Sequence, residues 1–146
     1  MVHDLYQEII LDHSKRPRNC HAMEDATRKA EGYNPLCGDK LKLFIKMEND
    51  VVQDVSFVGS GCAISTASAS LMTESLKGKS REEALKLLEK FHELLTTDTP
   101  VSNELGKLVV FCGVRDYPAR VKCATLAWHT LKSALTSPED AVVSTE

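Results

Sequence analysis

Three cysteines and one aspartate have the residue types and the positions of a metal site. Cys37 and Asp39 flank a single glycine, Cys62 directly follows Gly59-Ser60-Gly61, and Cys123 lies far downstream. Thiolates and a carboxylate together form a tetrahedral donor set that Zn²⁺ accepts, with Zn–S bonds of about 2.3 Å. Their spacing matches no zinc finger, and the chain has no Cys-x-x-Cys pair. The spacing therefore leaves two readings open, a metal site assembled from distant segments or separate buried cysteines.

The elements around these residues are expected to be strands first and helices afterwards. Apolar residues alternate with lysines from Lys40 to Met47, which is the period of a half-buried strand. Later segments repeat their apolar residues at helical spacing. This order favours an α+β fold in which helices pack against a small antiparallel sheet. The predicted strands span 28–34, 40–47 and 51–58, and the predicted helices span 3–15, 62–76, 81–95, 105–112 and 118–135.

Local signals indicate several helix boundaries. Gly78 suits the position just after a helix end. Ser80 and Glu83 match a capping box, in which each side chain bonds the other residue's backbone amide. Gly113 is expected to end the helical segment before it, and Pro118 has a φ that suits the first position of the last helix.

Each of the three cysteines is predicted at the end of an element. Cys37 lies in the loop between the first two strands, Cys62 starts a helix rich in small residues, and Cys123 lies in the first two turns of the last helix. A helix N-terminus favours the thiolate form of cysteine. Loops and helix starts at one end of a sheet can converge, so these residues could face one ion. Gly38 would allow the tight bend between Cys37 and Asp39.

Composition excludes several classes of protein. The chain has 146 residues, of which 42% are hydrophobic, and its 18 Lys+Arg and 21 Asp+Glu give a net charge of −3. This balance gives no footprint for nucleic acid, no apolar run could span a membrane, and the first residues do not read as a secretory signal. We therefore expect a cytoplasmic protein with one domain over 1–137 and a loose C-terminal tail over 138–146.

The motifs that contain these residues resemble the U-type iron–sulfur cluster assembly proteins, and within them the SufU branch. Scaffold-type IscU proteins have a histidine just before the last cysteine, where this chain has Lys122. The segment from Leu108 to Asp116 resembles a stretch that SufU proteins carry before that cysteine. The matching segments are Leu5-Tyr6, Asp12-His13, Pro17-Arg18-Asn19, Cys37-Gly38-Asp39, Gly59-Ser60-Gly61-Cys62 and Tyr117-Pro118-Ala119-Arg120-Val121-Lys122-Cys123-Ala124.

The resemblance implies a fold, a ligand set and an activity. The fold is a three-stranded antiparallel sheet with about five helices, as in SufE- and NifU-like proteins. The implied ligands of Zn²⁺ are Cys37, Asp39, Cys62 and Cys123. The implied activity is that of a sulfurtransferase-like acceptor, rather than a stand-alone enzyme, which takes persulfide sulfur from a pyridoxal-phosphate cysteine desulfurase of the SufS type. The sulfur then passes toward a downstream cluster scaffold.

Cys37 is the predicted sulfur acceptor, because Gly38 is expected to make its loop more mobile than the helices that hold the other two cysteines. Four anionic ligands on a dication leave a net charge of about −2, and Arg120 is the predicted charge partner. The alternatives are a structural zinc site and a scaffold that binds iron or a [2Fe–2S] cluster through the same ligands. Cys20 is expected at the surface and Cys112 in the core, while His13 is expected to cap or pack in the first helix.

Overall fold

Three strands form an antiparallel meander in the computed structural model, which describes residues 2–35, 38–97, 103–136 and 141–144. The strands are β1 (Arg28–Asn34), β2 (Asp39–Glu48) and β3 (Val51–Ser60). Asn49 and Asp50 join β2 to β3 with φ angles of 53° and 64°. Two left-handed residues in a two-residue loop make the kind of hairpin whose twist matches its strands. The predicted antiparallel sheet is therefore confirmed.

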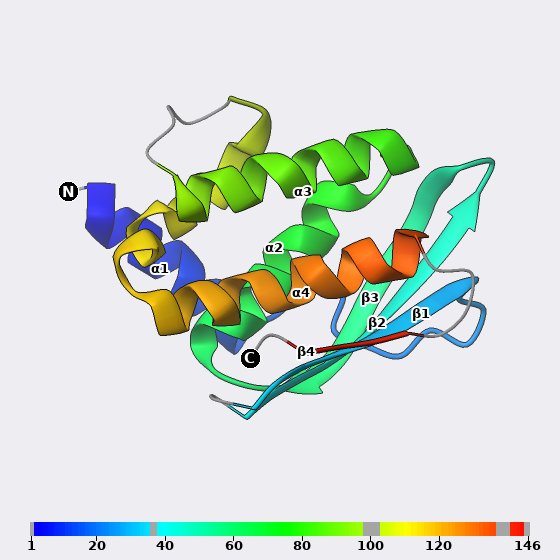
Figure 1. Ribbon diagram of the computed structural model, residues 1–146, viewed down its shortest axis with the longest axis horizontal. Coiled ribbons are helices and arrows are strands. Elements are labelled where there is room, and N and C mark those ends of the chain that lie inside the picture. Colours follow the sequence, from blue (N-terminus) through cyan, green and yellow to red (C-terminus); the bar gives the residue numbers. More distant parts are fainter. Residues whose placement is uncertain (1, 36–37, 98–102, 137–140, 145–146) are drawn as a thin grey trace.

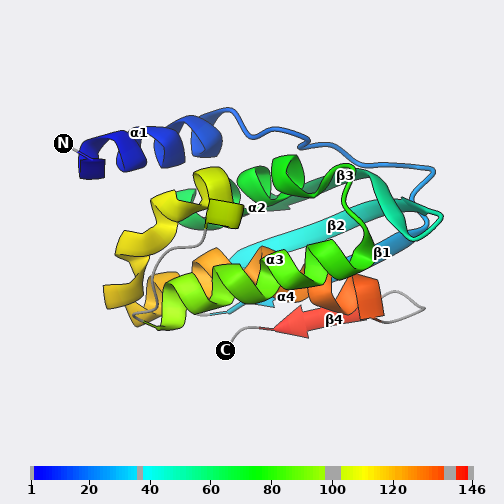
Figure 2. The ribbon, with the colours of Figure 1, turned by 90° about the horizontal axis from the view of Figure 1, so that it is seen from above.

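Helical segments cover one face of this sheet (Figure 1). Leu41, Leu43 and Ile45 of β2 are buried on that face, as the alternation with lysine predicts. Figure 2 shows α1 (Val2–Lys15) on the side of β3, and β4 (Ala141–Ser144) at the opposite edge of the sheet. The helical segments of the described residues are α1 (Val2–Lys15), α2 (Ala63–Leu76), α3 (Arg81–Thr96), the 3₁₀ segment η1 (Asn103–Asp116) and α4 (Pro118–Thr136).

Helix α2 lies in the core, as its small side chains predict. The Ser68 hydroxyl donates to the Ala124 carbonyl of α4, and the Trp128 indole nitrogen donates to the Ser68 hydroxyl at 3.1 Å. Trp128 in turn stacks on Phe91 of α3, with ring centroids 4.6 Å apart. The Ser80–Glu83 capping box at the start of α3 is present as predicted. These contacts hold α2 and α4 together, and each of these helices carries a cysteine of the predicted site near its start.

Two sequence expectations are wrong in part. Gly113 does not end its helical segment, because only Gly106 within η1 adopts a positive φ (54°) and η1 continues to Asp116. The segment 138–146, expected as a loose tail, contains strand β4 (Ala141–Ser144), which pairs in parallel with β1. An edge strand exposes unpaired backbone groups, and β4 satisfies those of β1. Within the described residues, no helix is long and apolar enough to cross a bilayer.

Candidate metal centre

The predicted site residues of the described chain meet where strand ends and helix starts come together. Asp39 is the first residue of β2 and lies opposite Asn34, the last residue of β1. Cys62 follows β3 and is the N-cap of α2, and Cys123 lies in the second turn of α4. The convergence predicted for helix starts and loops at one end of the sheet is therefore present for these three residues.

The ligand atoms of Asp39, Cys62 and Cys123 all lie within 4.8 Å of one another. Asp39 is 0% exposed and Cys123 is 3% exposed, while Cys62 is half-buried. The Cys62 backbone N–H donates to Asp39 Oδ1 at 2.9 Å, and Cys62 Sγ lies 4.0 Å from Asp39 Oδ2. A buried carboxylate and two sulfurs thus share one small volume that opens to the surface on the side of Cys62.

Two glycines shape this volume. Gly38 has a φ of 71°, a left-handed conformation that glycine adopts at little cost, so the predicted bend before Asp39 is present. A Cβ atom at Gly61 would lie 2.5 Å from Asp39 Oδ1, closer than atoms can approach without displacement. Gly61 therefore leaves the space that the Asp39 carboxylate occupies beside Cys62.

Each of the two sulfurs accepts a hydrogen bond from an N–H group. The Ser65 backbone N–H in the first turn of α2 donates to Cys62 Sγ at 3.4 Å. The side-chain amide of Asn34 donates to Cys123 Sγ at 3.7 Å, and Asn34 is 0% exposed. These two N–H donors hold the sulfurs of Cys62 and Cys123 in fixed orientations beside Asp39.

This donor set fits a zinc ion. Donor atoms around a four-coordinate ion with bonds of about 2.0–2.3 Å are spaced roughly 3.5–4 Å apart. Cys62 Sγ lies 4.0 Å from Asp39 Oδ2, and all three ligand atoms lie within 4.8 Å of one another. A buried carboxylate beside two sulfurs needs a compensating positive charge. The three residues therefore supply three ligands of the kinds that zinc prefers, and one further ligand completes a tetrahedron.

The remaining predicted residues fall in different places. Cys37, the fourth predicted ligand and the predicted acceptor, lies outside the described residues. The side chain of Arg120 is exposed, three residues before Cys123 on α4, and its role as a charge partner stays a prediction. Cys20 is exposed as expected, and Cys112 is partly buried against the core.

An apolar groove lies beside the candidate metal centre, between α1, η1 and the starts of α2 and α4. It encloses a volume of about 380 Å³, and Ile64, two residues after Cys62, forms part of its wall. Tyr117 is 59% exposed at its rim, a large fraction for an aromatic side chain. The other side chains that line it include Tyr6, Ile10, Val110, Val114 and Arg120.

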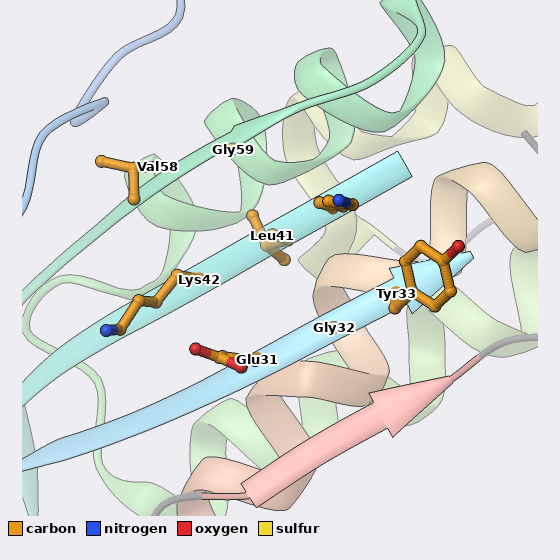
Figure 3. A pocket seen from close by; sticks show the side chains of 8 residues that line it. Glu31, Gly32, Tyr33, Leu41, Lys42, Val58 and Gly59 are labelled. Atoms are coloured by element: carbon orange, nitrogen blue, oxygen red, sulfur yellow. The ribbon is translucent and has the colours of Figure 1, made fainter. Parts of the chain in front are cut away.

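A second hollow of about 370 Å³ lies on the opposite face of the sheet, away from the helices (Figure 3). Tyr33, Lys40 and Lys42 project from this face, whereas their neighbours Asn34, Asp39 and Leu41 are buried on the helical side. Side chains alternate between the two faces of a strand. The lysine-lined hollow is therefore separated from the candidate metal centre by the sheet itself.

Sequence reasoning missed the roles of Asn34 and Gly61. Asn34 precedes Pro35 at a strand end, which reads as an ordinary turn signal. Its contact with Cys123 joins residues 89 positions apart, a separation that no local pattern reports. Gly61 was visible as part of the turn before Cys62, but its packing against Asp39 depends on how β2 and β3 pair.

The fold and the site define a class: an α+β protein whose antiparallel sheet and helix starts present an aspartate and cysteines to one point. Residues 5–136 match the family described as NifU-like N terminal domain. The chain is therefore a member of that family.

Relatives of this chain have two kinds of name. It is 43% identical over 135 residues to the iron–sulfur cluster assembly scaffold protein IscU of Streptococcus pyogenes. That alignment covers 92% of this chain and 84% of the relative. It is 40% identical over 136 residues to the zinc-dependent sulfurtransferase SufU of Bacillus subtilis, covering 92% of each chain.

A solved structure also has the same fold. A crystal structure described as an iron–sulfur cluster assembly scaffold protein for the SUF system of Fervidobacterium islandicum matches with a TM-score of 0.83 and 38% identity, and covers 93% of this chain and 100% of that one. The membership expected from the sequence is thus confirmed, and the fold is that of a SufU structure.

Proposed function

We propose that this protein accepts sulfur from the persulfide of a cysteine desulfurase and passes it on for iron–sulfur cluster assembly, with a zinc ion held by Cys37, Asp39, Cys62 and Cys123. The observation that supports it best is the convergence of Asp39, Cys62 and Cys123 within 4.8 Å of one another. Residues so distant in sequence need not meet for the fold alone, and their meeting as three metal-ligand types is what a zinc-dependent acceptor requires.

Zinc suits sulfur transfer better than a redox-active metal would. Bound zinc would keep the thiolates deprotonated at neutral pH and exchange ligands without redox chemistry of its own. The N–H groups of Ser65 and Asn34 hold the sulfurs of Cys62 and Cys123 in place. Both of these cysteines lie near the starts of long, packed helices, so we assign them as retained ligands.

Cys37 is the acceptor in this proposal. Its thiolate attacks the outer sulfur of the persulfide on the partner's cysteine, as in thiol–disulfide exchange. The S–S bond of that persulfide breaks, a new S–S bond forms on Cys37, and the partner's cysteine leaves as a thiolate. One S–S bond breaks and one forms, and the total charge is unchanged. The step therefore needs no outside oxidant.

The surface beside the site suits an approaching partner. Arg120 lies on the rim of the apolar groove, one helical turn before Cys123. A guanidinium there would offset the net negative charge of about −2 on the loaded site. We propose that the partner is a pyridoxal-phosphate desulfurase of the SufS type, because the SufU of Bacillus subtilis is named a zinc-dependent sulfurtransferase.

A scaffold that builds a [2Fe–2S] cluster on the same ligands is the second candidate. The name of the Streptococcus pyogenes relative favours it, since that protein is called an assembly scaffold. One residue argues against a scaffold: Lys122 precedes Cys123 where scaffold-type IscU proteins have a histidine. A lysine ammonium is a poor ligand for iron. Sulfur transfer is therefore the better supported of the two.

Metal analysis combined with a desulfurase assay tests the proposal. The purified protein is expected to contain one zinc per chain and to show no visible absorption. In the presence of a reductant, it is expected to increase the release of sulfide from cysteine by a SufS-type desulfurase. Cys37→Ala is expected to abolish the increase, whereas Cys20→Ala, which removes an exposed cysteine outside the site, is expected to retain it.

Two results would contradict the proposal. A brown protein with about two irons per chain and no zinc supports the scaffold instead. Full stimulation by Cys37→Ala would show that the acceptor assignment is wrong. By contrast, a Cys37→Ala protein that keeps its zinc but gives no stimulation would support sulfur transfer over a purely structural site.

A further inference from the structure

We infer that Asn34 is a positioning residue of the metal centre: its side-chain amide fixes the sulfur of Cys123 and moderates its donor strength. The inference rests on the proposed function only in that the site must bind a metal ion. Nothing in the sequence pattern assigns Asn34 a role, so the inference comes from its burial and its contact with Cys123.

Asn34 is placed to do this by the sheet. It is the last residue of β1, paired with Asp39, so its side chain points to the same inner face as the Asp39 carboxylate. Its Nδ2 lies 3.7 Å from Cys123 Sγ, within the range of an N–H···S hydrogen bond, and the residue is 0% exposed. A buried amide stabilises a fold only when its polar atoms have partners, and here one partner is a metal-ligand sulfur.

The position of Cys123 within α4 differs from that of Cys62 at the start of α2. In an α-helix only the first four backbone N–H groups lack a partner within the helix. Cys62 is the N-cap of α2, and its sulfur accepts a hydrogen bond from one of these groups, the Ser65 backbone N–H. Cys123 is the sixth residue of α4, which begins at Pro118, so it lies beyond the free N–H groups of its own helix. Asn34 supplies from β1 the kind of donor that α2 supplies to Cys62 from its backbone.

The chemical effect follows from where the donor points. An N–H···S hydrogen bond withdraws electron density from a thiolate and partly offsets the negative charge of a site rich in anionic ligands. It also holds the sulfur in one orientation. Partners of metal ligands typically account for 10–100-fold in metal affinity, so loss of the Asn34 amide is expected to weaken the site measurably without removing a ligand.

Cobalt substitution tests this with a readout that a purely structural role would not move. Asn34→Leu removes the donor, and Asn34→Ser keeps a polar group that is too short to reach Cys123. In both Co²⁺-loaded variants the sulfur-to-cobalt charge-transfer band is expected to move to longer wavelength. Metal transfer to an excess of chelator is expected to be roughly tenfold faster than in the unchanged protein.

Thr130→Val is the matched control. Thr130 is also 0% exposed and its hydroxyl donates to the Leu126 carbonyl of α4, so the variant loses one buried hydrogen bond away from the centre. It is expected to lower the thermal midpoint while leaving the cobalt band and the rate of metal transfer unchanged. If Asn34→Leu does not fold, Asn34→Ser decides the question by the same two measurements.

The inference is overturned if a folded Asn34 variant shows the cobalt band and the transfer rate of the unchanged protein. It is also overturned if the Thr130→Val control moves both readouts equally. A protein that binds cobalt normally but does not stimulate a desulfurase would contradict the proposed sulfur transfer and leave the role of Asn34 standing, so the two failures can be told apart.

Discussion

Two buried polar clusters in this molecule differ in how their hydrogen-bonding capacity is balanced. The first joins α1 to α2: His13 Nδ1 lies 2.7 Å from the Ser70 hydroxyl, His13 Nε2 lies 3.5 Å from a Glu74 oxygen, and the Arg18 backbone N–H donates to the same hydroxyl at 2.8 Å. The second is the candidate metal centre. Both are buried at element junctions, and both join residues far apart in sequence.

In the His13 cluster, donors and acceptors match within the chain, because imidazole and hydroxyl groups can each do both. In the metal centre, a carboxylate and two sulfurs converge, and as anions these groups only accept. Two N–H donors to the sulfurs and one to Asp39 offset part of that excess. A surplus of buried acceptors is favourable only beside a cation. The comparison thus distinguishes a cluster whose polar groups satisfy one another from one whose acceptors suit a cation.

The largest expected effect comes from removing a ligand. Cys62→Ser is expected to preserve the fold, but it replaces a soft thiolate with a hydroxyl. The zinc content is therefore expected to fall from one per chain to less than about a tenth after dialysis against a weak chelator. Plasma emission spectrometry measures the metal. His13→Gln, which alters the other cluster, is the control and is expected to retain a full equivalent. Equal zinc in the two variants would erase the distinction drawn between the clusters.

Removal of the His13 ring is expected to have the opposite profile. His13→Leu leaves the Ser70 hydroxyl without its imidazole partner, while the Arg18 N–H still donates to that hydroxyl. The loss costs roughly 1–3 kcal/mol of unfolding free energy. Zinc content is expected to be unchanged. Urea unfolding measures the loss, with Ser14→Ala on the exposed side of α1 as the control for an α1 hydrogen bond at the surface. If His13→Leu also released zinc, the two clusters would be coupled.

The sequence supports much of the fold because its signals are local. The alternation from Lys40 to Met47, the Ser80–Glu83 box and Pro118 each determine a neighbour's conformation within a few residues, and each is confirmed. Strand β4 could not be predicted in this way, because a four-residue strand depends on an available sheet edge elsewhere in the chain. Likewise, apolar residues at helical spacing did not reveal that η1 is 3₁₀ with a break at Gly106.

The site divides along the same line. Residue types and positions at element ends make a site shared by Asp39, Cys62 and Cys123 one of two open interpretations, and the family resemblance favours it. What supports them could not be predicted: the Asn34 amide approaches Cys123 only because β1 and α4 pack together, and Gly61 faces Asp39 only because β3 pairs with β2 in that register. Candidate ligands can be proposed from residue types and a family resemblance, whereas their supporting contacts require the fold.

A smaller effect is expected from crowding the Asp39 carboxylate. In Gly61→Ala the new Cβ would lie 2.5 Å from Asp39 Oδ1, so the carboxylate must shift away from the sulfurs. Zinc affinity, measured by competition with a chromogenic chelator, is expected to fall by about tenfold. Gly113→Ala is the control, because nothing lies within 4 Å of its added Cβ. Unchanged affinity in Gly61→Ala would mean that Asp39 is not held in a ligand position by this contact.

The smallest expected effect is the pH dependence of the His13 cluster. Burial lowers the pKa of His13 below its ordinary value of 6.5, and the nearby Arg18 charge lowers it further, while Glu74 and Asp12 act in the opposite direction. Above about pH 6.5 the ring is neutral in both folded and unfolded chains, so its contribution to stability does not change. Below that pH the unfolded chain takes up a proton that the folded chain does not, and stability falls.

Urea unfolding of the metal-free protein between pH 7.5 and pH 5.5 measures this dependence without interference from zinc release. The unchanged chain is expected to lose more stability over this interval than His13→Gln, which cannot titrate there. His129 is half-buried and its pKa is also lowered, first by burial and then by His92, so His129→Gln is expected to remove a separate part of the slope. If His13→Gln leaves the slope unchanged, the His13 ring takes up its proton at the same pH in the folded and unfolded chains, and burial in the α1–α2 cluster does not oppose its charge.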